Sequence, residues 1–174
     1  MKSSPIIIAV AAVTIDGKIA RHAGHFTDWT SPEDKTFLHD LLDKSDIIVV
    51  GNNTYKIAQK QLAERSCVVF THSVRTTARQ HDNLLFCNPG RVDMRTILDP
   101  YKTVAVLGGT QTYTYFLEND LLDEIYLTIE PLVFGRGLNI FESTAAKEEK
   151  PRLLAVKKLN KEGSILLHYG IRRA

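Results

Sequence analysis

Short runs of β-branched and other apolar residues alternate with helical patterns along most of this sequence. Strands that alternate with helices are typical of a largely parallel sheet with helices packed on its faces. The apolar runs predict strands at residues 6–13, 47–50, 67–71, 103–107 and 124–130. The amphipathic patterns between them predict helices at residues 32–44, 54–62 and 111–117.

The last part of the chain has a different pattern. Two apolar stretches, residues 153–159 and 164–171, flank Asn160-Lys161-Glu162-Gly163, a polar run that ends in glycine. Such a run between two strands predicts a β-hairpin, whose strands are antiparallel. We therefore predict an α/β fold with one domain over residues 1–174. It would be a mixed, mostly parallel sheet, flanked by helices, with a C-terminal antiparallel hairpin.

The composition is that of an ordinary globular chain and excludes several function classes. The 174 residues are 44% hydrophobic and 24% charged, which suits one domain with a sizeable core. A formal net charge of +2 gives no basic patch for nucleic acid or a membrane surface. The apolar run 6–13 is too short to span a bilayer and lacks a cleavage pattern, so we interpret it as a buried strand. Cys67 and Cys87 form no CxxC pair, which favours reduced thiols and a cytoplasmic location.

Asp34 is the carboxylate whose position most strongly suggests chemistry. Ser31 can cap the helix that begins after Trp29. The apolar stripe of that helix consists of Phe37, Leu38, Leu41 and Leu42. At about 100° per residue, Asp34 falls near the centre of this stripe. A carboxylate in apolar surroundings needs a partner or has a raised pKa, as a proton donor or substrate anchor would. The alternative is structural, since a carboxylate at the third helical position completes a capping box.

Two strand-to-helix junctions carry small and polar residues. The strand at 47–50 ends in Gly51-Asn52-Asn53-Thr54, and the strand at 103–107 ends in Gly108-Gly109-Thr110. Free N–H groups at a helix start bind anions, and glycine lets a phosphate approach the backbone. The two junctions, which match neither GxGxxG nor a P-loop, therefore predict a grip on a pyrophosphate from both sides. The alternative is that each junction is only a tight turn with a polar cap.

Further polar features are weaker. Thr71-His72-Ser73 follows a strand and could hold a phosphate on a ribose, with a plain polar loop as the alternative. His22 and His25 have HxxH spacing without a supporting cluster of Cys or carboxylate, so we predict loop histidines and no metal site. Arg136 could meet an anionic substrate, although we expect a solvated side chain. No GxSxG motif supports a hydrolase.

Together these pieces resemble the dihydrofolate reductase superfamily over nearly the whole chain. Ala11-Ala12-Val13, followed by Asp16-Gly17-Lys18-Ile19-Ala20, resembles its first strand and the start of its flexible active-site loop. Trp29-x-x-Pro32-x-Asp34 resembles the segment that carries the acid of folate reductases. Two runs resemble the dinucleotide-phosphate sites of the family: Gly51-x-x-Thr54-Tyr55 and Gly108-Gly109-x-x-x-Tyr113. Ile125-Tyr126-Leu127-Thr128 resembles the strand whose threonine supports the acid.

This resemblance implies an NADPH-dependent oxidoreductase with a cis peptide bond in the double glycine. Asp34 and Thr128 would be the catalytic residues. The residues implied to bind the substrate are Trp29, Asp34, Arg65 and Tyr113. The residues implied to bind the cofactor are Ala12, Gly17, Gly51, Asn53, Thr54, Thr71, His72, Ser73, Gly108, Gly109, Thr110, Gln111 and Thr112.

Two branches of the superfamily share features with the chain. The run Asp16–Ala20 and the segment 131–137 leading to Phe141 are similar to the RibD C-terminal reductase domain of bacterial riboflavin biosynthesis. That domain reduces the ribose of a pyrimidine ribosylamine phosphate with NADPH. The Trp-x-x-Pro-x-Asp run and Arg65 are more similar to folate reductases, where an arginine so placed holds the glutamate tail of the substrate.

The chain also departs from both branches. Residues 56–64 stand where the riboflavin branch usually has Asp-Asp-Pro-x-Leu-Thr-x-Arg. Asn52 stands where folate reductases often have a basic residue for the 2′-phosphate of NADPH, so NADH is an alternative cofactor. His72 and Arg75 could contact that phosphate instead.

We therefore predict a reductase that resembles the 5-amino-6-(5-phosphoribosylamino)uracil reductase of riboflavin biosynthesis. Reduction of a pterin by a dihydrofolate reductase-type enzyme, or a dinucleotide-binding module without catalysis, are the alternatives. No H-x-E and P-C-x-x-C pair is present, so we expect no fused deaminase. The expected partners are a small-molecule substrate (a pyrimidine ribosylamine phosphate or a pterin) and a second copy of the chain in a homodimer. Nucleic acid and membranes are not expected partners.

Overall fold

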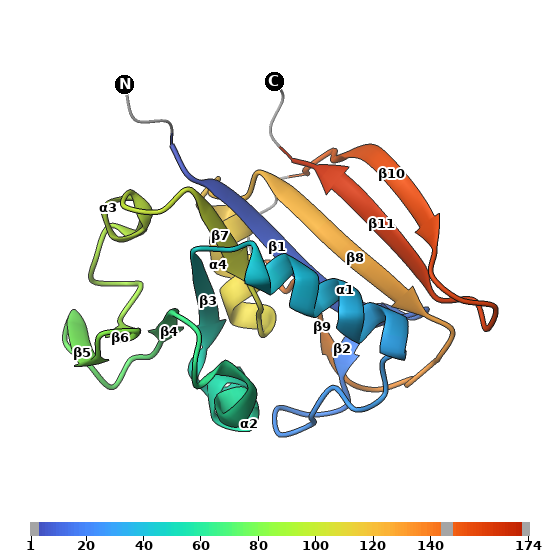
Figure 1. The fold of residues 1–174 in the computed structure, drawn as a ribbon, viewed down its shortest axis with the longest axis horizontal. Coiled ribbons are helices and arrows are strands. Elements are labelled where there is room, and N and C mark those ends of the chain that lie inside the picture. The colour runs from blue at the N-terminus through green and yellow to red at the C-terminus, as the bar shows by residue number, and fades with distance from the viewer. Residues whose placement is uncertain (1–3, 144–147, 172–174) are drawn as a thin grey trace.

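The computed structural model describes residues 4–143 and 148–171 of the chain, which form a twisted sheet with helices on both faces (Figure 1). The strands of the main sheet are β1 (Ile6–Thr14), β3 (Ile47–Gly51), β4 (Cys67–Phe70), β5 (Thr77–His81), β6 (Leu84–Cys87), β7 (Thr103–Val106), β8 (Glu124–Glu130), β10 (Arg152–Lys158) and β11 (Ile165–Gly170). A separate pair consists of β2 (Lys18–Ala20) and β9 (Leu138–Asn139). The helices are α1 (Pro32–Asp43), α2 (Asn52–Leu62), α3 (Met94–Leu98) and α4 (Thr110–Glu118).

The order of the nine strands is β10-β11-β8-β1-β7-β3-β4-β6-β5. The run from β8 to β6 is parallel throughout. β11 pairs with β8 antiparallel, β10 pairs with β11 in the C-terminal hairpin, and β5 pairs antiparallel with β6. The predicted mixed, mostly parallel sheet with a C-terminal hairpin is thus confirmed.

Each face of the sheet has its own apolar core, as the alternation along β3 shows. Ile47 and Val49 pack on one face with residues of α3 and α4. Ile48 and Val50 pack on the other face with residues of α1 and α2, the two helices nearest the viewer in Figure 1. All four side chains are buried because helices cover both faces, which explains the continuous apolar run of this strand.

The structure contains elements that the sequence pattern did not indicate: β2, β5, β6, α3 and β9. All five residues of β5 are exposed, so that strand has no apolar alternation to detect. β2 and β9 have three and two residues. Helix α2 begins at Asn52, two residues before the predicted start, because Gly51 ends β3 and caps the helix directly.

The state of the two cysteines and the search for a membrane helix also relate to the sequence predictions. Cys67 and Cys87 are buried free thiols, and burial raises the pKa of each to about 11. Protonated thiols of this kind are weak nucleophiles. Within the described part of the chain, no helix is both long and apolar enough to cross a membrane.

Candidate active site

The parallel strands bring most of the predicted site residues to one edge of the sheet. Because these strands run in the same direction, their carboxyl ends lie at the same edge, where ligands of α/β proteins usually bind. In the order of the sheet, β8 contributes Thr128, and the turn after β1 contributes Gly17. Gly108 then follows β7, Gly51 ends β3, and Thr71 follows β4.

The two glycine-bearing junctions are in direct contact. The N–H of Gly51 donates a hydrogen bond to the carbonyl oxygen of Gly108 at 2.6 Å. A Cβ atom on Gly51 would lie 2.9 Å from Oγ1 of Thr112, so a side chain there would force a shift. A Cβ atom on Gly109 would lie 3.4 Å from Oγ1 of Thr54. The Gly108–Gly109 peptide bond is cis, as the resemblance implied.

The helix starts at these junctions also lack side-chain caps. Ser31 caps α1 and Asp93 caps α3, each through its side chain. The N-cap residues of α2 and α4 are Gly51 and Gly109, which have no side chain to do so. Main-chain N–H groups in the first turns of α2 and α4 are therefore left for another acceptor, and the helix dipole favours an anion there. The alternative of a plain turn with a polar side-chain cap does not describe these two helices.

The remaining predicted cofactor residues differ in their contacts and burial. Thr71 is buried, and its Oγ1 lies 2.9 Å from Oγ of Ser73 and accepts from the N–H of Ser73 at 3.2 Å. Oγ1 of Thr110 donates to the carbonyl of Asn139 at 2.5 Å, which ties α4 to β9. Four of these residues are exposed: Asn53, His72, Ser73 and Gln111. Two are partly buried: Ala12 and Gly17.

Asp34 and Thr128, the predicted catalytic pair, are brought together although they are far apart in sequence. Asp34 is 6% exposed in the first turn of α1, and Thr128 of β8 is 1% exposed. Burial and repulsion from Glu130 raise the pKa of Asp34, whereas hydrogen bonding to Thr128 and Thr30 lowers it. Burial is the largest effect, so the pKa of Asp34 lies above its usual value.

Only half of the capping box considered for Asp34 is present. Oγ of Ser31 accepts the N–H of Asp34 at 3.2 Å. The N–H of Ser31 donates instead to Oε1 of Glu130 at 2.8 Å, so the Asp34 carboxylate does not close the box. The sequence analysis missed Glu130, which is 3% exposed. Its position could have suggested this role: Glu130 follows Thr128 by two residues on one strand, and residues two apart on a strand face the same side of the sheet.

Two of the predicted substrate residues have different surroundings. Trp29 packs edge-on against Phe134 with ring centroids 5.1 Å apart, and its buried indole N–H has no hydrogen-bond partner among the described residues. The hydroxyl of Tyr113 donates to the carbonyl of Val10 at 2.6 Å, and its ring fills the space where a Cβ of Gly108 would lie. The ring of Tyr113 therefore packs against Gly108 and supports the glycine turn. The indole N–H of Trp29, in contrast, is a buried donor without an acceptor among the described residues.

Arg65 is not brought to Asp34. Its Nη2 pairs with Oδ1 of Asp43 at 2.6 Å, at the start of β4 and the far end of α1. Asp43 lies nine positions after Asp34, or about 13 Å along the helix. Arg65 instead borders a pocket of about 570 Å³ between α2 and the β5–β6 hairpin, together with Lys56 and His81.

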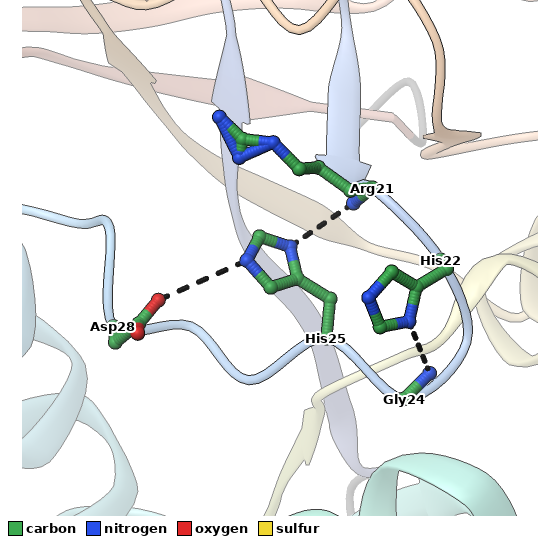
Figure 2. Close-up of polar contacts among 5 residues, drawn as sticks. All are labelled: Arg21, His22, Gly24, His25 and Asp28. Carbon is green, nitrogen blue, oxygen red and sulfur yellow. Dashed lines mark hydrogen bonds and ion pairs between the residues drawn. The ribbon is translucent and has the colours of Figure 1, made fainter.

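The two histidines of the loop between β2 and α1 bond within that loop (Figure 2). Nδ1 of His25 accepts the N–H of Arg21 at 3.0 Å, and its Nε2 lies 3.8 Å from Oδ1 of Asp28. Nδ1 of His22 accepts the N–H of Gly24 at 3.3 Å. In residues 4–143 and 148–171, no group of three or more His, Cys, Asp or Glu side chains could hold a metal ion.

Phe134 and Asp16 join this loop region to the segment that follows β8. The Arg21 guanidinium lies 4.0 Å from the centroid of the Phe134 ring, which also contacts His25. Oδ1 of Asp16 accepts the N–H of Phe134 at 3.1 Å, and Oδ2 accepts that of Gly135 at 2.8 Å. A hydrogen bond from Thr14 is the main reason that the pKa of Asp16 is lowered. Arg136, in the same segment, is exposed, as expected.

The family model described as the RibD C-terminal domain matches residues 5–100 and 68–164, which together span most of the chain. The protein YwjB of Bacillus subtilis (strain 168) is 27% identical over 168 residues, which cover 91% of this chain and 93% of YwjB.

Two solved structures show the same fold. The first is a diaminohydroxyphosphoribosylaminopyrimidine deaminase/5-amino-6-(5-phosphoribosylamino)uracil reductase from Thermotoga maritima, with a TM-score of 0.72 at 20% identity. The match covers 97% of this chain and 57% of that one, so this chain spans little more than half of the Thermotoga protein. The second is dihydrofolate reductase from Enterococcus faecalis, with a TM-score of 0.69 at 17% identity over 99% of this chain and 100% of that one. The predicted dihydrofolate reductase-like fold is confirmed.

Proposed function

Because the chain belongs to the family of the RibD C-terminal domain, we propose that it is a reductase that takes hydride from a nicotinamide dinucleotide, with NADPH as the preferred form. The observation that carries this proposal is the pair of uncapped helix starts at Gly51 and Gly109, which lie at the ends of adjacent strands. Such a pair offers main-chain donors to a pyrophosphate from two sides. The dihydrofolate reductase of the same fold was solved with NADP(H), which supports this cofactor class.

The residues at the strand ends fit such a cofactor, whose nicotinamide supplies the hydride chemistry when it is bound. The first turns of α2 and α4 would bind the pyrophosphate, with Thr54 and Thr112 at their contact. Thr71, His72 and Ser73 would bind a phosphate on the ribose, since they lie beside α2 at the end of the next strand.

Asp34 would be the acid or the substrate anchor of the reaction. Burial raises the pKa of Asp34 above its usual value and so favours the protonated form, which suits a proton donor. Thr128 would orient that carboxyl, and the unsatisfied indole N–H of Trp29 would donate to the substrate.

The proposed substrate is a pyrimidine ribosylamine phosphate. The Asp16–Ala20 run and the loop from Pro131 to Gly137, which Asp16 joins to the first strand, support this choice. The name of the Thermotoga protein includes the same reductase activity. A pterin is the second candidate, favoured by the hydrogen bond between Asp34 and Thr128.

The decisive experiment is an assay of NADPH oxidation with purified protein. We expect loss of nicotinamide absorbance with the ribosylaminopyrimidine substrate, and slower or no loss with dihydrofolate. The reverse preference would support the pterin reductase. Tight NADPH binding without turnover on either substrate would support a dinucleotide-binding module without catalysis.

We also propose that the chain acts in the cytoplasm as one domain and as a homodimer. Every residue of the edge strand β10 is exposed, including Leu153, Leu154 and Val156. An exposed edge strand with apolar side chains can pair with another chain, which supports a dimer through β10. Sedimentation of the wild type should give a dimer mass, and Val156→Asp should give a monomer.

A further inference from the structure

Glu130 is a buried carboxylate that accepts hydrogen bonds from two distant segments. Its Oε1 accepts both the N–H and the Oγ–H of Ser31, each at 2.8 Å, and its Oε2 accepts the Oγ–H of Ser164. Among the described residues, no lysine or arginine pairs with it. A buried carboxylate without a cationic partner is costly to the fold. The three hydrogen bonds to Glu130 offset part of this cost, which suggests that the position has a specific function.

The contacts with Ser31 show what that role is. In a complete capping box, the third helical residue returns a hydrogen bond to the N–H of the N-cap residue. Asp34 occupies that third position of α1, but Glu130 accepts the bond in its place. The Asp34 carboxyl is therefore left to interact with Thr128 and Thr30 instead of its own helix start.

We propose that Glu130 is a positioning residue for Asp34: it replaces Asp34 in the helix cap and so holds the Asp34 carboxyl at the carboxyl end of β8. This inference rests on the proposed function of Asp34 as the active-site acid. Glu130 itself contacts no reacting group in this scheme; it acts through Ser31 and through its charge.

The charge of Glu130 has a second effect on the same carboxyl. Repulsion between the two carboxylates adds to burial in raising the pKa of Asp34. The other ionisable groups that interact with Asp34 are Lys35 of its own helix, which lowers that pKa, and Tyr113 of α4. Glu130 is thus the acidic neighbour that favours the protonated form of Asp34.

A hydrogen-bonded chain connects Glu130 to the turn of the C-terminal hairpin. Nδ2 of Asn160 donates to Oγ of Ser164 at 2.9 Å and to Oε2 of Glu33 at 3.2 Å. Oδ1 of Asn160 accepts the N–H groups of Gly163 and Ser164, each at 3.0 Å. The hairpin turn therefore holds the same helix start that Glu130 holds.

The test is a pH titration of the Asp34 carboxyl by carboxyl-carbon NMR in the wild type and in Glu130→Gln. The signal is assigned by its absence in Asp34→Asn. We expect Asp34 to titrate at a lower pH in Glu130→Gln, because both the repulsion and the substitute cap acceptor are weakened. Asp46→Asn is the matched control, since Asp46 also accepts two backbone N–H groups, those of Lys102 and Thr103, but at the opposite edge of the sheet. An unchanged Asp34 titration in Glu130→Gln, or an equal shift in Asp46→Asn, would overturn the inference.

If Glu130→Gln does not fold, the same titration is done with Glu130→Asp. It keeps the charge but draws the carboxylate away from Ser31, so the cap should revert to Asp34 and its titration should again move to lower pH. With an active enzyme, the alkaline limb of the kcat profile should move in parallel, while the KM for NADPH stays within about twofold, because Glu130 does not bind the cofactor. Since the NMR readout needs no turnover, a shifted titration in an inactive protein would count against the proposed function and not against the positioning role.

Discussion

The N–H of Gly51 donates to the carbonyl oxygen of Gly108 across adjacent strands, at 2.6 Å. This bond joins the last residue of β3 to the turn after β7, and so fixes the starts of α2 and α4 relative to each other. Two uncapped helix starts held this way would offer the proposed pyrophosphate donors that are already oriented before it arrives, which reduces the entropy lost on binding.

The closeness of Gly51 to Thr112 makes the packing of this junction testable. Gly51→Ala should lower the free energy of unfolding by about 1–3 kcal/mol, because the added methyl overlaps Oγ1 of Thr112. Thr112→Ala in the same chain should recover part of that loss. Gly90→Ala is the control, since its Cβ would meet only Asn88 at 3.6 Å. Urea denaturation gives the free energy of unfolding of the wild type, the two single variants and the double variant. Equal losses for Gly51→Ala and Gly90→Ala would contradict the close packing of Gly51 against Thr112.

NADPH should raise the melting temperature if the two helix starts bind its pyrophosphate. A ligand at a hundred times its Kd adds about 2.7 kcal/mol to stability by mass action. Thermal melts with increasing NADPH and NADH measure the effect. A melting curve that neither dinucleotide shifts at millimolar concentration is incompatible with the reductase.

His72 and Arg75 should distinguish the two dinucleotides. If they contact the 2′-phosphate, replacing both with alanine should weaken NADPH by about 1.5–3 kcal/mol and leave NADH nearly unchanged. Calorimetric titration gives both affinities. Arg79→Ala is the control, because its Nη1 donates to the backbone of Asp82. Equal losses for both dinucleotides would show that the pair does not recognise the phosphate.

Asp34→Asn should lower turnover by about 10²–10⁴-fold if the carboxyl is a general acid. Cofactor binding should change little. The folded-state pKa of Asp34 is raised, so its contribution to stability is fully present below pH 3.8 and is lost as pH rises through the raised pKa. The asparagine variant should therefore be as stable as the wild type or more so at neutral pH, with the difference shrinking in acid. A variant that is less stable at pH 7 yet fully active would leave Asp34 with only a structural role.

Thr128→Val should move the titration of Asp34 in the opposite direction to Glu130→Gln. The Thr128 hydrogen bond lowers the pKa of Asp34, so its loss should raise that pKa further and extend activity to higher pH. Thr128→Ser, which keeps the hydroxyl, should restore the wild-type profile. Identical pH profiles for the valine and serine variants would contradict a functional contact.

The sequence predicted what depends on local pattern and short spacing. The strand Glu124–Glu130 has its predicted bounds, and the burial of Asp34 follows from its place in the apolar stripe of α1. The role of Glu130 could not be predicted, because its partners Ser31 and Ser164 are 99 and 34 residues away. The hydrogen bond from the Tyr113 hydroxyl to the carbonyl of Val10, 103 residues earlier, could not be predicted either. Contacts between residues so far apart in the sequence depend on the order of the strands in the sheet, and the hydrophobic periodicity of the sequence does not determine that order.

The strand order also separates the two groups of residues to which we assign different roles. Strand β1 lies between β8, which carries Thr128 and Glu130, and β7, which leads to the double glycine. Asp34 and the residues that hold it thus come from α1, β8 and the hairpin, whereas the positions proposed for the dinucleotide come mainly from β7, β3 and β4. With the roles proposed above, substitutions on the β8 side of β1 would change the substrate site and leave the phosphate site in place. Under the proposed function, a molecule divided in this way would exchange one substrate for another while its source of reducing equivalents stays the same.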